Sequence, residues 1–240
     1  MIKSRKSVWA KAVFHVYVMR LLEKSFHQFH LFGPAPRPQS DAPVLLVPNH
    51  STWWDGFFVY LLNEKILKRD LYLMMLDSQL KKYSFFARVG AFGITPGDRD
   101  NVRESLGYAV DLLKKDNVLI CMFPQGHLLP WAARPLHFQT GIESIIRQFG
   151  KPITLLPLAM RAEFGLEQRP DVYFQFGEPL PVTPASFAGV SWLEKVETDL
   201  LAELEHNIQR REKSVPLVQG RSSINAKMDR WLNRAERNQI

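Results

Sequence analysis

The sequence lacks the features that mark secreted, disulfide-stabilised or membrane-spanning proteins. Cys121 is the only cysteine among 240 residues, so no disulfide can form within the chain. Its position inside an apolar run predicts a small buried hydrophobe. No run of about 20 apolar residues is present, and the apolar part near the start is broken by charges without a small-residue cleavage site after it. Internal repeats and low-complexity segments are also missing. The length suits one sizeable α/β domain with a large core.

Positive charge is in excess and is unevenly distributed. The formal net charge is +7, with basic residues crowded at both ends of the chain. The basic residues at the ends are Lys3, Arg5, Lys6, Lys11, Arg210, Arg211, Lys213, Arg221, Lys227, Arg230, Arg234 and Arg237. Such ends attract nucleic acid or anionic lipid. No nucleic-acid-binding motif accompanies them, so we expect lipid headgroups as partners and no nucleic acid. A solvated basic face is the alternative.

Two apolar stretches near the N-terminus predict a pair of short helices that lie on a membrane. Residues 8–22 are apolar on nearly every side of a helix, apart from Lys11, His15 and Arg20. A helix of that length reaches roughly 22 Å, which is short of the roughly 30 Å hydrocarbon layer. Residues 26–32 form a second aromatic-rich stretch. Insertion into one leaflet is expected, and packing against the domain as ordinary core helices is the alternative. His27 and His30 lie at helical spacing without a third ligand, so no metal is assigned.

A Gly- and Pro-rich linker at residues 33–38 predicts the domain boundary. We expect membrane-associating helices over 1–32, a catalytic domain over 33–215 and a basic helical tail over 216–240. Within the domain, strands are predicted at 43–48, 71–76, 117–123, 152–160 and 171–177. Helices are predicted near 54–65, 78–89, 101–115, 141–149 and 192–211. This alternation predicts an α/β fold with a mixed, largely parallel sheet flanked by helices.

A His and an Asp five residues apart follow the first strand of the domain. His50 comes directly after the apolar run 44–47, and Asp55 follows where a helix is expected to begin. Open α/β sheets place their chemistry at the carboxyl ends of strands. A carboxylate that accepts from one ring nitrogen orients an imidazole and fixes its tautomer, so that the other nitrogen can take a proton from a hydroxyl. No Ser or Cys stands as an obvious nucleophile, so the activated hydroxyl is expected to belong to the substrate. The alternative is that His50 only caps the turn.

Polar residues follow two further strand ends. The strand at 117–123 leads into Pro124-Gln125-Gly126-His127, and a loop at 92–99 ends in Arg99. A third apolar strand, 151–159, is interrupted by Pro157. Three strand ends with polar tips can meet in one cleft.

With these four blocks the chain resembles the glycerolipid acyltransferases, the group that includes 1-acylglycerol-3-phosphate acyltransferases. Asn49, His50 and Asp55 match the first block of that family, and 92–99 matches the second, an aromatic-rich turn ending in Arg. Phe123, Pro124 and Gly126 match part of the third, and 155–159 matches the fourth. The order and the separations agree over roughly residues 40 to 180.

The third block departs from the family pattern. The family's Glu is Gln125 here, its Thr is His127 and its Arg is Leu128. A later position that is Lys in many members is Gln139. An acid and two cations are thus replaced by neutral groups. Because a bidentate Arg binds phosphate far better than a neutral amide does, the resemblance supports acyl transfer more firmly than a phosphate-bearing acceptor.

The resemblance implies direct acyl transfer from a thioester to a hydroxyl without an acyl-enzyme. His50 would act as general base and Asp55 would orient it. Backbone amides around Gly126 would be oxyanion donors. Substrate-binding roles fall on Arg99, Phe123, Pro124, Gln125, Gly126 and His127. Acyl-CoA or acyl carrier protein would be the co-substrate, with no other cofactor, and the enzyme would sit on the cytoplasmic face of a membrane as a peripheral or monotopic protein.

Three functions stay open. The first is an O-acyltransferase acting on a lysophospholipid such as 1-acylglycerol 3-phosphate. The second is the same chemistry on a neutral lipid or sugar hydroxyl, which the altered third block motivates. The third is a non-catalytic acyl-lipid-binding protein, against which the intact His50 and Asp55 argue.

Overall fold

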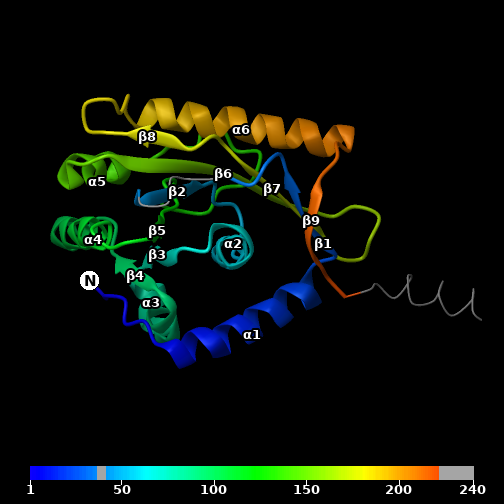
Figure 1. Cartoon of the computed structure of the whole chain (residues 1–240), viewed down its shortest axis with the longest axis horizontal. Helices are drawn as coiled ribbons and strands as arrows, with labels where there is room; N and C mark the ends of the chain where they lie inside the picture. Colours follow the sequence, from blue (N-terminus) through cyan, green and yellow to red (C-terminus); the bar gives the residue numbers. More distant parts are fainter. Residues whose placement is uncertain (37–41, 222–240) are drawn as a thin grey trace, which may run out of the picture.

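The fold is a nine-stranded mixed sheet with helices on both faces (Figure 1). The structure is a computed structural model, and it describes residues 1–36 and 42–221. The strands are β1 (Gln28–Phe32), β2 (Val44–Pro48), β3 (Asp70–Leu76), β4 (Ala91–Ile94), β5 (Val118–Cys121), β6 (Ile153–Glu163), β7 (Asp171–Phe176), β8 (Leu180–Val182) and β9 (Val215–Gln219). The α-helices are α1 (Val8–Ser25), α2 (Asp55–Leu62), α3 (Asp77–Lys82), α4 (Arg99–Leu112), α5 (Gly141–Phe149) and α6 (Val190–Arg210). Asn63–Leu67 forms a π-helical turn, and Ser84–Val89 forms a 3-10 helix.

The strand order is β4-β3-β5-β2-β6-β7-β1-β9, and β8 pairs with β6. From β4 through β3, β5 and β2 to β6 each pair of adjacent strands is parallel, whereas β7 is antiparallel to β6 and β9 is antiparallel to β1. The expected mixed, largely parallel sheet is therefore confirmed. Its central strands are apolar on both sides because helices cover both faces.

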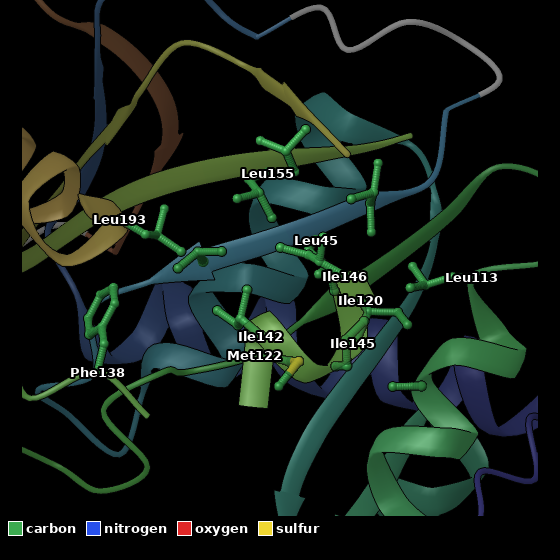
Figure 2. Close-up of a cluster of buried hydrophobic side chains, with 14 of the residues drawn as sticks. Leu45, Leu113, Ile120, Met122, Phe138, Ile142, Ile145, Ile146, Leu155 and Leu193 are labelled. Carbon is green, nitrogen blue, oxygen red and sulfur yellow. The ribbon is translucent and has the colours of Figure 1, made fainter. Parts of the chain in front are cut away.

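Alternate residues of the central strands supply two separate cores. On β2, Leu45 and Val47 face the core under α4, α5 and α6, whereas Val44 and Leu46 face the core under α1 and α2. Figure 2 shows the first of these cores, where Ile142 of α5 lies among strand side chains. This period of two is what a sheet requires, and it leaves the sheet buried on both faces.

The expected second N-terminal helix is wrong, because residues 28–32 form β1. This strand pairs in parallel with β7 and antiparallel with β9, so it lies inside the sheet. Phe29 and Leu31 are buried and alternate with the half-buried His30, a period-two pattern that suits a strand better than a helix. β1 thus precedes the expected boundary at residue 33 and yet belongs to the same sheet as the strands that follow it.

The helix α1 packs one face into the core and leaves the opposite face exposed. Ala10, Phe14, Val18 and Leu22 are buried at intervals of four residues. No helix in the described part of the chain is long and apolar enough to cross a membrane. The expected basic helical tail begins within β9, and residues 222–240 lie outside the described residues.

The N-terminal segment completes the outer edge of the sheet next to β4. Gly93 donates its N–H to the carbonyl of Ile2 at 2.8 Å. Asp77 accepts from Ile2 N at 3.0 Å, from Thr95 Oγ1 at 3.1 Å and from Asn101 Nδ2 at 2.8 Å. Burial opposes the charged form of Asp77, but these hydrogen bonds outweigh it and lower its pKa. The loop that leads to Arg99 is therefore fixed from both sides.

Candidate active site

The site lies where β2 leaves the sheet. β2 ends at Pro48, which has no N–H to extend the ladder, and Asn49 replaces the missing strand contact with its side chain. Asn49 Oδ1 accepts from Met160 N at 2.8 Å, and Nδ2 donates to Met160 O at 3.1 Å. Trp131 Nε1 donates to the same carbonyl at 3.0 Å. The Asn49 side chain thus holds the start of the turn against β6.

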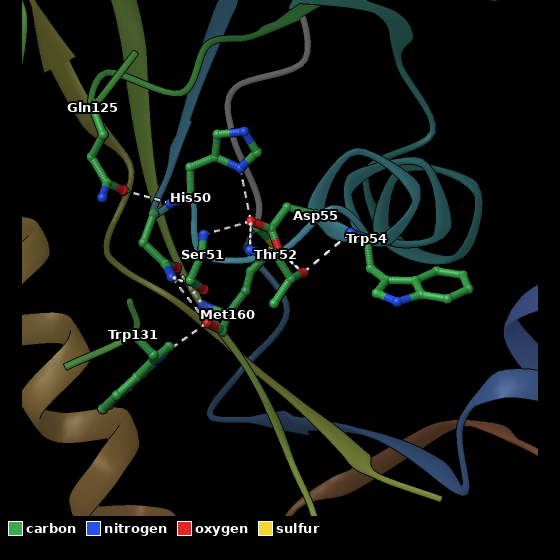
Figure 3. A network of polar contacts seen from close by, with 9 residues as sticks. His50, Ser51, Thr52, Trp54, Asp55, Gln125, Trp131 and Met160 are labelled. Carbon is green, nitrogen blue, oxygen red and sulfur yellow. Dashed lines mark hydrogen bonds and ion pairs between the residues drawn. The ribbon is translucent and has the colours of Figure 1, made fainter. Parts of the chain in front are cut away.

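The Asp55 carboxylate accepts hydrogen bonds from several residues of the turn that follows β2 (Figure 3). Its Oδ2 accepts from His50 Nδ1 at 2.8 Å, from Ser51 N at 2.7 Å and from Thr52 N at 2.9 Å. Its Oδ1 accepts from Thr52 Oγ1 at 2.6 Å, and that hydroxyl oxygen accepts from Trp54 N at 3.2 Å. Four donors satisfy a carboxylate that is only 1% exposed and that begins α2. The expected His50–Asp55 contact is present.

This geometry sets the tautomer of His50. Because Nδ1 faces a carboxylate, Nδ1 carries the proton and Nε2 keeps a lone pair. The Phe123 ring stacks on the imidazole with centroids 4.0 Å apart and an interplanar angle of 20°. The side chain of His50 remains 24% exposed. The ring is therefore oriented on one edge, supported on one face and still reachable from solvent.

Gln125 lies against the backbone of His50. Its Oε1 accepts from His50 N at 2.5 Å, and the residue is 2% exposed. The Glu that the family carries at this position also has a side-chain oxygen that could accept this bond. The neutral replacement keeps the acceptor and removes a buried charge, whose burial is costly. In this structure Gln125 acts on the position of His50.

The remaining residues of the third block form a turn beside the histidine. Gly126, at φ +73°, donates its N–H to Phe123 O at 3.0 Å, and Pro124 O accepts from Gln139 N at 2.8 Å. The N–H of Gly126 itself is thus already used, which leaves the expected oxyanion donor to another amide of this turn. His127 is exposed. Phe123, Pro124, Gln125 and Gly126 are brought together with His50.

The chain between this turn and α5 is anchored at both ends. Leu129 donates its N–H to His50 O at 3.0 Å. Further on, Glu194 of α6 accepts three backbone N–H groups, from Leu136 at 2.9 Å, from His137 at 3.1 Å and from Phe138 at 3.0 Å. His137 has φ +57°, and successive N–H groups around such a residue form an anion-binding nest. The Glu194 carboxylate occupies this nest. No sequence pattern predicts this role for Glu194.

Arg99 lies at the same edge of the sheet, at the first turn of α4. Strands β2, β4 and β5 are parallel, so the loops after them leave one edge together. Arg99 is exposed and borders an open pocket of about 440 Å³ between α4 and α5. The pocket is lined by Gly97, Arg99, Val102, Arg103, Leu106, Ser144 and Gln148. No sequence signal marks Ser144 and Gln148, because the pattern of residues 141–149 predicts only a helix.

Arg134 is turned away from this pocket and towards its own loop. Its Nη1 donates to Trp131 O at 2.9 Å and to Ala133 O at 2.7 Å, and its guanidinium lies 5.6 Å from the Trp131 ring centroid. Its Nη1 atom is therefore used within the loop. Among the described residues no group of three His, Cys, Asp or Glu side chains is placed to hold a metal ion.

A buried acid lies directly behind the turn. Glu197 of α6 is 0% exposed, and neither carboxyl oxygen has a hydrogen-bond partner among the described residues. It faces the backbone of Asn49 and Leu158, and Arg134 is the cation that acts on it. Burial raises the pKa of this carboxyl to about 8; the nearby backbone N–H groups, which do not meet hydrogen-bond geometry, and Arg134 oppose this by less. Burial therefore favours the protonated, neutral form of Glu197.

Comparison with known proteins agrees with this geometry. The profile of the acyltransferase family matches residues 28–161, more than half of the chain. The protein belongs to this acyltransferase family, and the expected class of enzyme is confirmed.

Two relatives carry a more specific description. The chain is 24% identical over 216 residues to the 1-acyl-sn-glycerol-3-phosphate acyltransferase of Streptococcus pneumoniae, covering 84% of this chain and 76% of that protein. The crystal structure of the 1-acyl-sn-glycerophosphate acyltransferase PlsC from Thermotoga maritima is similar with a TM-score of 0.51 at 18% identity, covering 75% of this chain and 72% of that one. The latter likeness shows the shared fold.

Neutralising Glu197 should flatten the pH dependence of stability. The pKa of about 8 in the folded protein exceeds the ordinary value of 4.5. Between these values the folded state holds a proton that the unfolded state has lost, so stability falls as pH rises. Glu197→Gln should therefore raise the free energy of unfolding relative to the parent by an amount that grows from pH 5 to pH 8, on the order of a few kcal/mol at pH 8. Denaturant titrations at both pH values measure this.

The matched control for that variant is Glu203→Gln, an exposed glutamate on the same helix. It should change stability equally at both pH values. A Glu197→Gln difference that is the same at pH 5 and at pH 8 would show that the buried acid does not titrate as described.

Proposed function

We propose that this acyltransferase moves a fatty acyl group from an acyl thioester to a hydroxyl of a lysophospholipid such as 1-acylglycerol 3-phosphate. The observation that carries the chemistry is the His50–Asp55 pair, with Nδ1 and Oδ2 2.8 Å apart at the carboxyl end of β2. The substrate class draws support from the name of the Streptococcus pneumoniae relative, a 1-acyl-sn-glycerol-3-phosphate acyltransferase.

The proposed reaction needs no covalent enzyme intermediate. The Nε2 atom of His50 takes the proton from the acceptor hydroxyl, and the hydroxyl oxygen attacks the thioester carbonyl carbon. The resulting imidazolium is stabilised by the Asp55 carboxylate. When the tetrahedral intermediate collapses, the carbon–sulfur bond breaks, and the leaving thiolate takes the proton back from Nε2. The products are an ester and a free thiol, either of CoA or of an acyl carrier protein.

Arg99 is the first candidate for the acceptor phosphate. The third block has lost its cation at Leu128, and Arg134 is bonded to its own loop. Arg99 is exposed, and the pocket that it borders also holds Arg103 and two neutral polar side chains. A neutral acceptor is the second candidate function, and the absence of a cation at positions 128 and 139 favours it.

Membrane contact is proposed for the exposed face of α1. Trp9, Val13 and Tyr17 are 56–58% exposed, and Val8 is 90% exposed. The opposite face of α1 is buried, so the helix lies along the protein with an apolar side outward. A helix in this position suits contact with a bilayer in which a lipid acceptor resides. Because acyl-CoA or acyl carrier protein is the expected acyl donor, we propose that the protein contacts the cytoplasmic side of the membrane.

Removing the base should abolish most of the activity. His50→Ala should lower the rate of thiol release from a long-chain acyl-CoA by roughly 10²–10⁴, because a positioned base contributes that much. The partly exposed side chain can be shortened without opening the core. His206→Ala, an exposed histidine on α6, should keep the parent rate. If the purified His50→Ala protein transfers at the parent rate, the proposed mechanism fails.

The identity of the acceptor is tested by comparing the kinetics with a phosphate-bearing acceptor and with a neutral one. Arg99→Ala should raise the KM for 1-acylglycerol 3-phosphate by about tenfold or more, since hydrogen bonds to charged groups are worth about 1.5–3 kcal/mol. It should leave kcat/KM for monoacylglycerol unchanged. Arg147→Ala, an exposed cation on α5, should affect neither. If monoacylglycerol is the best acceptor of the unmodified protein, the neutral-acceptor function replaces the first.

The exposed face of α1 can be tested without disturbing its buried face. Deleting the segment would remove core residues and a strand, so substitutions are the sharper test. Val13→Ser/Val16→Ser/Tyr17→Ser should lower partition into phosphatidylglycerol-containing vesicles by at least about tenfold, because three apolar side chains no longer enter the bilayer. High salt should weaken parent binding only in part. Sedimentation with vesicles measures both, and unchanged binding of the triple variant would exclude this face as the anchor.

A further inference from the structure

The loop between β6 and β7 exposes two large apolar side chains. Phe164 is 74% exposed, and Leu166 is 96% exposed. Single exposed apolar residues are common on soluble proteins, so exposure alone does not indicate a binding surface. The position of this loop next to the end of α1 is the second indication of a binding surface.

The loop is attached to the end of α1. His27, two residues after α1, donates its N–H to Pro170 O at 2.9 Å. Arg169 Nη1 donates to Arg221 O at 2.6 Å, and Arg221 N donates to Glu23 O at 2.8 Å. Figure 1 shows the loop between β6 and β7 beyond the end of α1 that adjoins β1. The base of the loop is therefore joined to the end of α1, and the loop extends the molecule beyond that end of the helix.

An open groove runs along the exposed face of α1. Its volume is about 680 Å³. Val13, Val16 and Tyr17 give it an apolar floor, and Arg20, Lys24 and Arg221 border it with positive charge. Apolar surface edged by cations matches the layered chemistry of an anionic bilayer, in which phosphates lie above acyl chains.

Charge argues against the other occupants of this surface. Arg20, Lys24, Arg169 and Arg221 outnumber the acids beside them, Glu23 and Glu167. The segment 222–240 contains four more basic residues, at 227, 230, 234 and 237, and two acids, Asp229 and Glu236, so its charge is also positive. Like charges repel, so neither that segment nor a second copy of this surface complements it. An anionic lipid surface does.

We propose that the loop at 164–170 inserts Phe164 and Leu166 into the same anionic bilayer that α1 contacts. This inference rests on the membrane contact proposed for α1. A single helix on a bilayer can roll about its own axis, whereas a helix and a loop tip together define a plane. The second contact thus fixes the orientation of the whole sheet, and of the site at its edge, relative to the lipid.

Partition into vesicles measures how much the loop contributes to the free energy of membrane binding. Phe164→Ser/Leu166→Ser should lower partition of the full chain into vesicles of 70% phosphatidylcholine and 30% phosphatidylglycerol by at least about tenfold. The matched control is Leu76→Ser/Val215→Ser, which removes two side chains that are 39% and 56% exposed elsewhere. The control should bind as the parent does. Equal binding of the loop variant and the parent would overturn the proposal.

A reporter on the loop tests insertion directly. Because Cys121 is fully buried, a cysteine introduced by Leu166→Cys can be labelled selectively with an environment-sensitive fluorophore. Its emission should shift to the blue when the vesicles are added, whereas a label at Val215→Cys should not respond. A label at position 166 that is already shielded without vesicles, and does not change with them, would show that another part of the chain or a second copy covers the loop. That result would also overturn the proposal.

Three readouts separate the possible failures. Loss of vesicle binding in the α1 variant but not in the loop variant would refute the loop alone. Absence of vesicle binding by the parent would refute both membrane proposals. Thiol release with detergent-dispersed 1-acylglycerol 3-phosphate does not need a bilayer, so the loop variant should keep the parent rate there. Failure of the parent in that assay would refute the proposed reaction instead.

Discussion

The Asp55 carboxylate is the interaction on which the site depends. It closes the turn between β2 and α2 by accepting two backbone N–H groups and a hydroxyl, and it orients His50 with the same oxygen that holds the turn. The His50–Asp55 contact that we propose for catalysis therefore depends on the same carboxylate as the local fold. A carboxylate in this position must be buried, and its four hydrogen-bond donors offset the free-energy cost of burying the charge.

Much of the scaffold could be predicted from the sequence, because its signals are local. The runs at 44–47 and 118–121 are apolar and short, and the blocks around His50 and Arg99 follow strand ends. What could not be predicted depends on partners far along the chain. Residues 28–32 become a strand because β7 and β9 lie on either side, and no local pattern names those partners. Glu194 and Glu197 carried no signal for the same reason.

The third block shows how a substitution can preserve a role while changing a charge. Gln125 accepts from the backbone of His50 as a carboxylate would, so losing the acid does not by itself disturb the histidine. The departure at Leu128 is different, since no neighbouring side chain of the block supplies a cation in its place. Nearby Arg134 is bonded to its own loop and faces the buried Glu197. Arg99 and Arg103 at the start of α4 therefore remain the proposed cations for an acceptor phosphate.

The position of β1 has a consequence for the order in which the molecule can be assembled during synthesis. β1 emerges from the ribosome early, yet its two neighbours are β7 and β9, which end at residues 176 and 219. Until β7 has been made β1 has two open edges, and until β9 has been made it still has one. Long-range pairing of this kind is slow and leaves apolar surface exposed in the meantime. The nascent chain therefore exposes the edges of β1 and its apolar side chains, even after α1 can pack on Phe57, Phe85 and Phe86.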